Sequence, residues 1–240
     1  MFKRIVLNRL VLLLIITMGI SCSIINKKIK PLTSPNAIAY KNNIERLTES
    51  FFDLLDEKKL PYPYKPDIII VNKVDSRFIP YKNKGKLITP YWEELDKSTQ
   101  DFFNKSVKNS EYNGRIFFET YFNWFLPIHE LGHFIQFINN DTLGHYKKEI
   151  NANEIAITYY REIGDTIKLN KLLNYIKNTR LKMIAPKDTS EEYFNNNYYN
   201  ILNSNSEEYG YFQFMFVEHA LKTKKKSVSE FYKNTNQPTY

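Results

Sequence analysis

The segment WFLPIHELGHFIQF, residues 124–137, constrains the fold of this chain more than any other stretch. Two of the chain's four histidines, His129 and His133, are four positions apart in it, with Glu130 directly after the first. Residues four apart project from the same face of an α-helix. The surrounding apolar residues can bury the flanks of such a helix, and Pro127 is tolerated in its first turn. The segment therefore predicts a helix that begins near Pro127 and directs two imidazoles at one point.

The rest of the chain predicts strands first and helices afterwards. Apolar residues at three- and four-residue steps predict a helix from Ile38 to Lys59, which the prolines of LPYPYKP end. Strands are expected at 67–74 and 85–92, and further helices at 93–108, 149–163, 166–183 and 208–222. Residues 114–126 suit either a strand with a turn or a helix, and residues 186–208 suit a loop with one short helix. The pattern indicates an α+β fold, with a small N-terminal sheet packed on a mostly helical C-terminal part.

The first 21 residues have the pattern of a secretory signal. Lys3, Arg4 and Arg9 precede the apolar run LVLLLIITMGI, which is too short for a membrane-spanning helix. Cys22, the chain's one cysteine, follows MGIS, where a bacterial lipoprotein signal would be cut. The alternatives are a plain signal peptide or a buried cysteine. We expect an exported lipoprotein of the cell envelope, facing the periplasm or the exterior, held on a membrane surface by a lipid on Cys22.

The composition agrees with one folded domain behind this leader. The expected division is a signal peptide at 1–21, a flexible tether at 22–37, the domain at 38–225 and a polar tail at 226–240. The chain's formal charge of +8 includes three positive charges of the leader, so the mature part is near +5. Because this excess is mild and its lysines are scattered, we expect no nucleic-acid partner.

Two imidazoles on one helical face are what a tetrahedral Zn²⁺ needs from its first two ligands. Glu130, one step round the helix, can reach the same pocket without ligating. From there it can take a proton from metal-bound water and pass it to a leaving amine. The continuation HxxGxxH is absent, because no glycine follows His133 in this stretch and Asn139 stands at the place of its third histidine. The third ligand must therefore come from elsewhere in the chain.

The stretch KKEINANEIAITYY, residues 147–160, offers that ligand on a second helix. Glu149, 16 residues after His133, can close the metal site and leave one position open, as a zinc hydrolase requires. Asn153, one turn further on, can orient a ligand through its amide. The small Ala152 would let the two helices approach. Glu154, about 100° round the helix from Asn153, is the rival third ligand.

HELGH followed by E-x-x-A-N resembles the gluzincins, thermolysin-like zinc metallopeptidases with HExxH on one helix and a glutamate on the next. The resemblance covers about residues 115–165. It implies a zincin-like domain that binds one Zn²⁺ through His129, His133 and Glu149 and hydrolyses a peptide or protein substrate. It also implies Glu130 as the general base. Asn153 stands where many relatives carry aspartate.

The resemblance further implies a donor for the oxyanion of the tetrahedral intermediate. Tyr209 and Tyr211 in EYGYFQF, and His219 on the same expected helix, are the candidates. Aromatic core packing is the alternative for each tyrosine, and a surface or partly buried helix position is the alternative for His219. We expect no role for His145, which lies between the two motif helices.

Two other functions compete with hydrolysis. One is a non-catalytic exported binding lipoprotein with a structural zinc site, although an intact Glu130 argues against it because a structural site needs no base. The other is a metal-free surface module, in which the two histidines have a structural role only.

Overall fold

The computed structural model describes residues 31–81, 84–106 and 113–232. The expected signal peptide, Cys22, most of the expected tether and the last eight residues lie outside this part. Within the described residues, no helix combines the length and the apolar character that crossing a bilayer requires.

The elements confirm a mixed α+β fold in which helices predominate. The N-terminal part contains α2 (Pro35–Glu57) and the strands β1 (Asp67–Val71), β2 (Arg77–Tyr81) and β3 (Lys84–Pro90). The middle contains the 3₁₀ turn η1 (Trp92–Glu94), α3 (Lys97–Ser106), α4 (Gly114–Phe118) and the π-helix η2 (Glu119–Phe125). The C-terminal part contains α5 (Leu126–Ile138), α6 (His145–Glu162), α7 (Thr166–Arg180), α8 (Glu191–Ser204), α9 (Ser206–Lys222) and the 3₁₀ turn η3 (Val228–Phe231).

The sheet has the strand order β1-β3-β2. β1 is parallel to β3, with Asp67 opposite Lys86, and β2 is antiparallel to β3. The sequence did not predict β2, because RFIPY contains Pro80. Proline lacks the N–H that a central strand needs, and β2 tolerates it because this strand is at the edge of the sheet.

Helix α2 begins three residues earlier than expected. The hydroxyl of Ser34 accepts a hydrogen bond from the N–H of Ala37, and Pro35 occupies the first turn. Residues 35–37 of the expected tether are therefore helical. Before them, the N–H of Leu32 donates to the carbonyl of Ile70 on β1 at 3.0 Å, so the chain is already attached to the domain there.

The ambiguous segment 114–126 is helical, and it runs without a break into the motif helix. The chain passes from α4 through η2 into α5, so the motif helix does not begin near Pro127 as expected. Pro127 has no N–H and its ring crowds the carbonyl four residues earlier, which an ordinary α-turn cannot accommodate. The turn directly before it is a π-turn, in which the N–H of Leu126 donates to the carbonyl of Tyr121.

The C-terminal helices differ from the expectations mainly at their ends. α6 begins four residues early, and α8 is a 14-residue helix where one short helix was expected. Residues 226–232 do not form a polar tail. Val228 is fully buried and its N–H donates to Glu162 at 3.0 Å, while the amide of Asn139 donates to the carbonyl of Phe231 at 2.8 Å.

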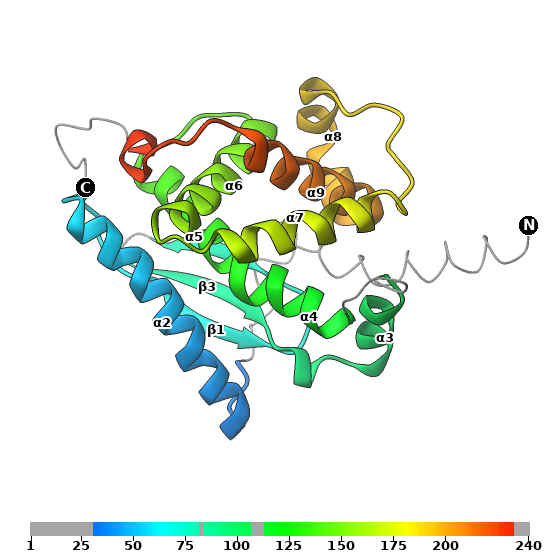
Figure 1. Ribbon diagram of the computed structural model, residues 1–240, viewed down its shortest axis with the longest axis horizontal. Helices are drawn as coiled ribbons and strands as arrows, with labels where there is room; N and C mark the ends of the chain where they lie inside the picture. Colours follow the sequence, from blue (N-terminus) through cyan, green and yellow to red (C-terminus); the bar gives the residue numbers. More distant parts are fainter. Residues whose placement is uncertain (1–30, 82–83, 107–112, 233–240) are drawn as a thin grey trace, which may run out of the picture.

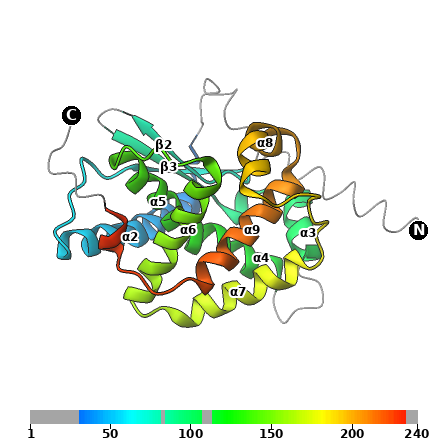
Figure 2. The ribbon, with the colours of Figure 1, turned by 90° about the horizontal axis from the view of Figure 1, so that it is seen from above.

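Helix α5 lies in the middle of the molecule (Figures 1 and 2). Its aromatic side chains pack toward the sheet, where Phe134 contacts Phe52 of α2 and Phe78 of β2. The helices α6, α7 and α9 lie beyond it, on the side away from the sheet (Figure 1). A second, smaller core of Phe194, Ile201, Phe212 and Phe216 joins α8 to α9. The motif helix is thus held between the sheet and the C-terminal helices.

Candidate metal centre

Helices α5 and α6 cross where two small residues meet. A Cβ atom added to Gly132 would lie 2.8 Å from the Cα of Ala152 and 2.9 Å from its carbonyl oxygen. No side chain fits at those distances, so glycine is required at this crossing. The close approach brings the face of α5 that carries the histidines against the first turns of α6.

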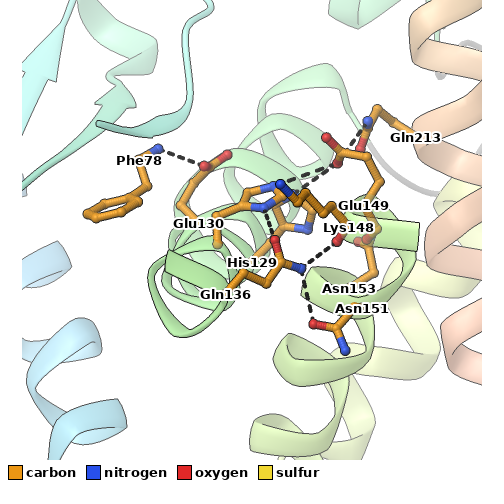
Figure 3. A network of polar contacts seen from close by, with 10 residues as sticks. Phe78, His129, Glu130, Gln136, Lys148, Glu149, Asn151, Asn153 and Gln213 are labelled. Atoms are coloured by element: carbon orange, nitrogen blue, oxygen red, sulfur yellow. Dashed lines mark hydrogen bonds and ion pairs between the residues drawn. The ribbon is translucent and has the colours of Figure 1, made fainter. Parts of the chain in front are cut away.

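Three donor groups converge at this crossing (Figure 3). The Nε2 atoms of His129 and His133 lie 3.5 and 3.8 Å from the same Glu149 oxygen, Oε2. The donor atoms of all three residues lie within 4.8 Å of one another. Ligands about 2.0–2.1 Å from a tetrahedral zinc ion lie about 3.4 Å apart. The donor set and its spacing therefore fit a zinc ion after small adjustments of the side chains.

The rival ligand, Glu154, has a different partner. Its Oε2 accepts from the Nζ of Lys226 at 2.6 Å, near the C-terminal turn η3. Glu149 is instead buried beside both imidazoles, with 5% of its surface exposed. The geometry favours Glu149 over Glu154 as the third donor.

Glu130 lies in the same buried region but faces the sheet. Its Oε2 accepts a hydrogen bond of 2.7 Å from the backbone N–H of Phe78 on β2 (Figure 3). Burial raises the pKa of the Glu130 carboxyl; the charges of His129 and His133 oppose this rise, and the charge of Glu149 adds to it. A carboxyl with a raised pKa, beside the donor cluster but not within it, suits a group that takes up and releases a proton.

Glu149 and His133 form a charge pair in the absence of a metal. Burial alone would raise the pKa of Glu149, but hydrogen bonds and positive charge from the two histidines outweigh it and hold that pKa far below its usual range. Burial likewise disfavours the charged form of His133, but the hydrogen bond and charge of Glu149 raise its pKa to about 9. A metal ion would take the place of the proton on the Nε2 of His133.

Two glutamines that the sequence analysis did not single out contact the donor groups. The side-chain N–H of Gln213 on α9 donates to Glu149 Oε2 at 3.1 Å. Gln136 on α5 lies 2.9 Å from the Nδ1 of His133 through its Oε1. The helical spacing of three between His133 and Gln136 could have indicated the second contact. No local signal links Gln213 to Glu149, because 64 residues separate them.

Asn153 is buried near the centre, but its amide holds its own helix. Its Nδ2 donates to the backbone carbonyl of Glu149 at 2.8 Å. Its Oδ1 and the Nδ1 of His129 are buried and have no hydrogen-bond partner among the described residues. The Asn153 oxygen can accept a hydrogen bond, and the His129 nitrogen can carry the proton that such a bond needs.

The three candidate oxyanion donors have different surroundings. Burial raises the pKa of Tyr209 well above its ordinary value, and the charges of Glu149 and Glu130 add to that rise, so its phenol lies in the field of both carboxylates. The hydroxyl of Tyr211 instead accepts from Arg180 at 3.0 Å. His219 is exposed near the end of α9. Tyr209 is thus the one of the three candidates whose pKa responds to the two carboxylates of the centre, and its side chain also packs, partly buried, against the second core.

Outside the centre, His145 stacks on Tyr198 with 3.7 Å between the ring centroids, so its contacts belong to the aromatic packing of α8.

Comparison of the chain with protein-family models, with curated proteins and with solved structures finds no match.

Proposed function

We propose that this protein is a zinc metallopeptidase with a gluzincin-like site on a zincin-like fold. The observation that carries the proposal is the convergence of His129, His133 and Glu149 on one point, with the Glu130 carboxyl beside it. Two imidazoles and one carboxylate leave an open position on a tetrahedral ion, which is the pattern of catalytic rather than structural zinc.

Zinc bound there would polarise the carbonyl of a peptide bond and make a water molecule more acidic. Glu130 takes the proton of the attacking water on its free carboxylate oxygen, while the N–H of Phe78 holds the other oxygen in place. The raised pKa of Glu130 suits it to hold that proton and then to give it to the leaving amine.

Tyr209 has a separate part in the proposal. Its phenol, kept protonated by burial and by the neighbouring carboxylates, can donate a hydrogen bond to an acceptor of growing negative charge. The carbonyl oxygen under attack is such an acceptor, and a preorganised donor stabilises it most where water is excluded.

We further propose that the enzyme is exported and attached to a membrane surface through a lipid on Cys22. The N-terminal pattern of the sequence supports this part of the proposal. The substrate is then a peptide or protein at the cell envelope, and nucleic acid has no part in the function.

Zinc-loaded protein of residues 23–240 incubated with a mixed peptide library tests the proposal, with new cleavage products detected by mass spectrometry. We expect cleavage by the wild type, none after chelation, and recovery when zinc is returned. Bound zinc without cleavage of any peptide would favour the binding lipoprotein with a structural zinc site.

A further inference from the structure

The side chain of Gln136 is fixed at both ends of its amide. It is 5% exposed, and it lies on α5 three residues after His133. Its Nε2 donates to the backbone carbonyl of Lys148 at 2.7 Å and to the Oδ1 of Asn151 at 3.0 Å, both on α6 (Figure 3). Its Oε1 lies 2.9 Å from the Nδ1 of His133. One buried amide thus links a histidine of α5 to the beginning of α6.

These contacts determine which way the amide points. A backbone carbonyl can only accept a hydrogen bond, so the nitrogen of the Gln136 amide must face Lys148. The oxygen must then face His133. Reversing the amide would set its oxygen against the carbonyl of Lys148, and burial leaves little access for water to relieve that contact.

The orientation of the amide determines the protonation of the imidazole. Because a carbonyl oxygen only accepts, the Nδ1 of His133 must carry a hydrogen. The neutral imidazole, which is the form that binds a metal, carries one N–H, so once the second proton has left, its lone pair is on Nε2, the atom that faces Glu149. A metal ion binds the lone pair of a neutral imidazole.

We propose that Gln136 is a positioning residue that holds His133 as the Nδ1–H tautomer, with Nε2 directed at the metal. This inference rests on the zinc site of the proposed function. It adds to that function a reason why the two histidines of one motif are not equivalent.

The two imidazoles differ in how they are held. The side chain of His129 is 3% exposed, and its Nδ1 has no partner among the described residues, so the surrounding core restrains it. The side chain of His133 is 24% exposed and has less packing to restrain it. A directional hydrogen bond is therefore needed more at His133, and Gln136 supplies it.

The test is the zinc affinity of Gln136→Met, measured by competition with a chromophoric chelator. Methionine keeps the length of the side chain and removes all three hydrogen bonds. We expect zinc to bind about 10- to 100-fold more weakly, the usual effect of losing a group that orients a ligand. Gln100→Met is the matched control, because Gln100 also donates from a partly buried Nε2 to a backbone carbonyl, that of Trp92 at 2.9 Å, outside the donor cluster. Its zinc affinity should equal that of the wild type.

A second measurement tests the inference on the wild type, so it does not depend on whether Gln136→Met folds. Nitrogen-15 NMR of the histidine rings in the zinc-loaded wild type should show His133 protonated at Nδ1 and not at Nε2.

Asn151→Ala removes one acceptor of the Gln136 amide and leaves the carbonyl of Lys148, so we expect a smaller loss of zinc affinity than in Gln136→Met.

The outcomes separate this inference from the proposed function. Unchanged zinc affinity in Gln136→Met, or a proton on Nε2 of His133 in the zinc-loaded wild type, would overturn the positioning role and leave hydrolysis intact. Weaker zinc binding by Gln136→Met than by the wild type, together with a wild type that cleaves no peptide, would support the positioning role while hydrolysis fails. A wild type that binds no zinc would overturn both.

Discussion

The centre has two sides, each built around one buried glutamate. On the sheet side, Glu130 has a backbone N–H of β2 as its hydrogen-bond donor. On the helical side, Glu149 is surrounded by donors: two imidazoles and the amide of Gln213. Both carboxyls are almost fully buried, yet the pKa of Glu130 is raised and that of Glu149 is lowered.

The difference shows that burial alone does not decide the role of a carboxyl. Where donors and positive charge outweigh the cost of burial, the group stays ionised and suits a cation. Where donors and positive charge do not outweigh the cost of burial, the carboxyl holds a proton more readily and suits general acid–base catalysis. Two carboxyls with pKa values pushed apart in one site are a recognised pattern of divided roles. Four measurements test the difference between the two carboxyls.

The largest effect is expected on the helical side, from Glu149→Gln. A neutral amide is a poor zinc ligand, so zinc affinity should fall by more than the 10- to 100-fold typical of groups that only orient ligands, and hydrolysis should be lost with it. Equilibrium dialysis against buffered zinc measures the change. Glu154→Gln is the matched control and should bind zinc normally. Normal zinc binding by Glu149→Gln with weak binding by Glu154→Gln would make Glu154 the third ligand instead.

Glu130→Gln addresses the sheet side. We expect zinc to remain bound while turnover falls by about 10²- to 10⁴-fold, the usual contribution of a general base. The metal-free variant should be at least as stable as the wild type, because the amide oxygen can still accept from Phe78 and no charge is buried. Peptide cleavage and thermal unfolding measure the two effects. Wild-type turnover in this variant would refute the division of roles.

Tyr209→Phe tests the phenol that lies in the field of both carboxylates. Loss of one preorganised donor to an oxyanion typically lowers kcat by about 10²- to 10³-fold, with zinc affinity little changed. Tyr211→Phe is the control, since the hydroxyl of Tyr211 contacts Arg180 and should not affect kcat. Equal effects of the two substitutions on kcat would remove Tyr209 from the mechanism.

The smallest effect concerns pH in the metal-free protein. The pKa of His133 is raised from about 6.5 to about 9, so its stabilising effect is complete below pH 6.5 and is lost as pH rises through 9. The free energy of unfolding should fall by roughly 1–3 kcal/mol across this range. Zinc affinity should rise over the same range, because the ion displaces the proton. His133→Gln should lose both trends, which thermal unfolding and zinc titration between pH 6 and 9.5 can check.

The sequence predicted the inner part of the site better than its surroundings. Helix periodicity, a local property of the chain, predicted that His129 and His133 share one face, and the second motif, E-x-x-A-N, indicated Glu149 as the third donor. The contact of Gln213 with Glu149 depends on how α9 packs on α6, and no local pattern encodes it. The hydrogen bond from the N–H of Phe78 to Glu130 was also not predicted. It comes from the edge strand β2, which the sequence did not indicate because the strand contains Pro80.

The fold shows the same division between local and distant effects. The apolar periodicity of α2 and the β-branched run of β1 predicted both elements within a few residues. The length of α8 was underestimated because its many asparagines have low intrinsic helix propensity, which the packing of Phe194 against Phe212 and Phe216 overrides. Residues 226–232 looked like a polar tail because their sequence is mostly polar, yet buried Val228 and hydrogen bonds to Glu162 and Asn139 attach them to the domain.

The most direct test of the account is the zinc content of purified protein, residues 23–240, by elemental analysis of the wild type and His133→Ala. We expect about one zinc ion per chain in the wild type and almost none in the variant, with both proteins folded by circular dichroism. A wild type that holds no zinc after reconstitution, or a variant that holds as much as the wild type, would contradict it.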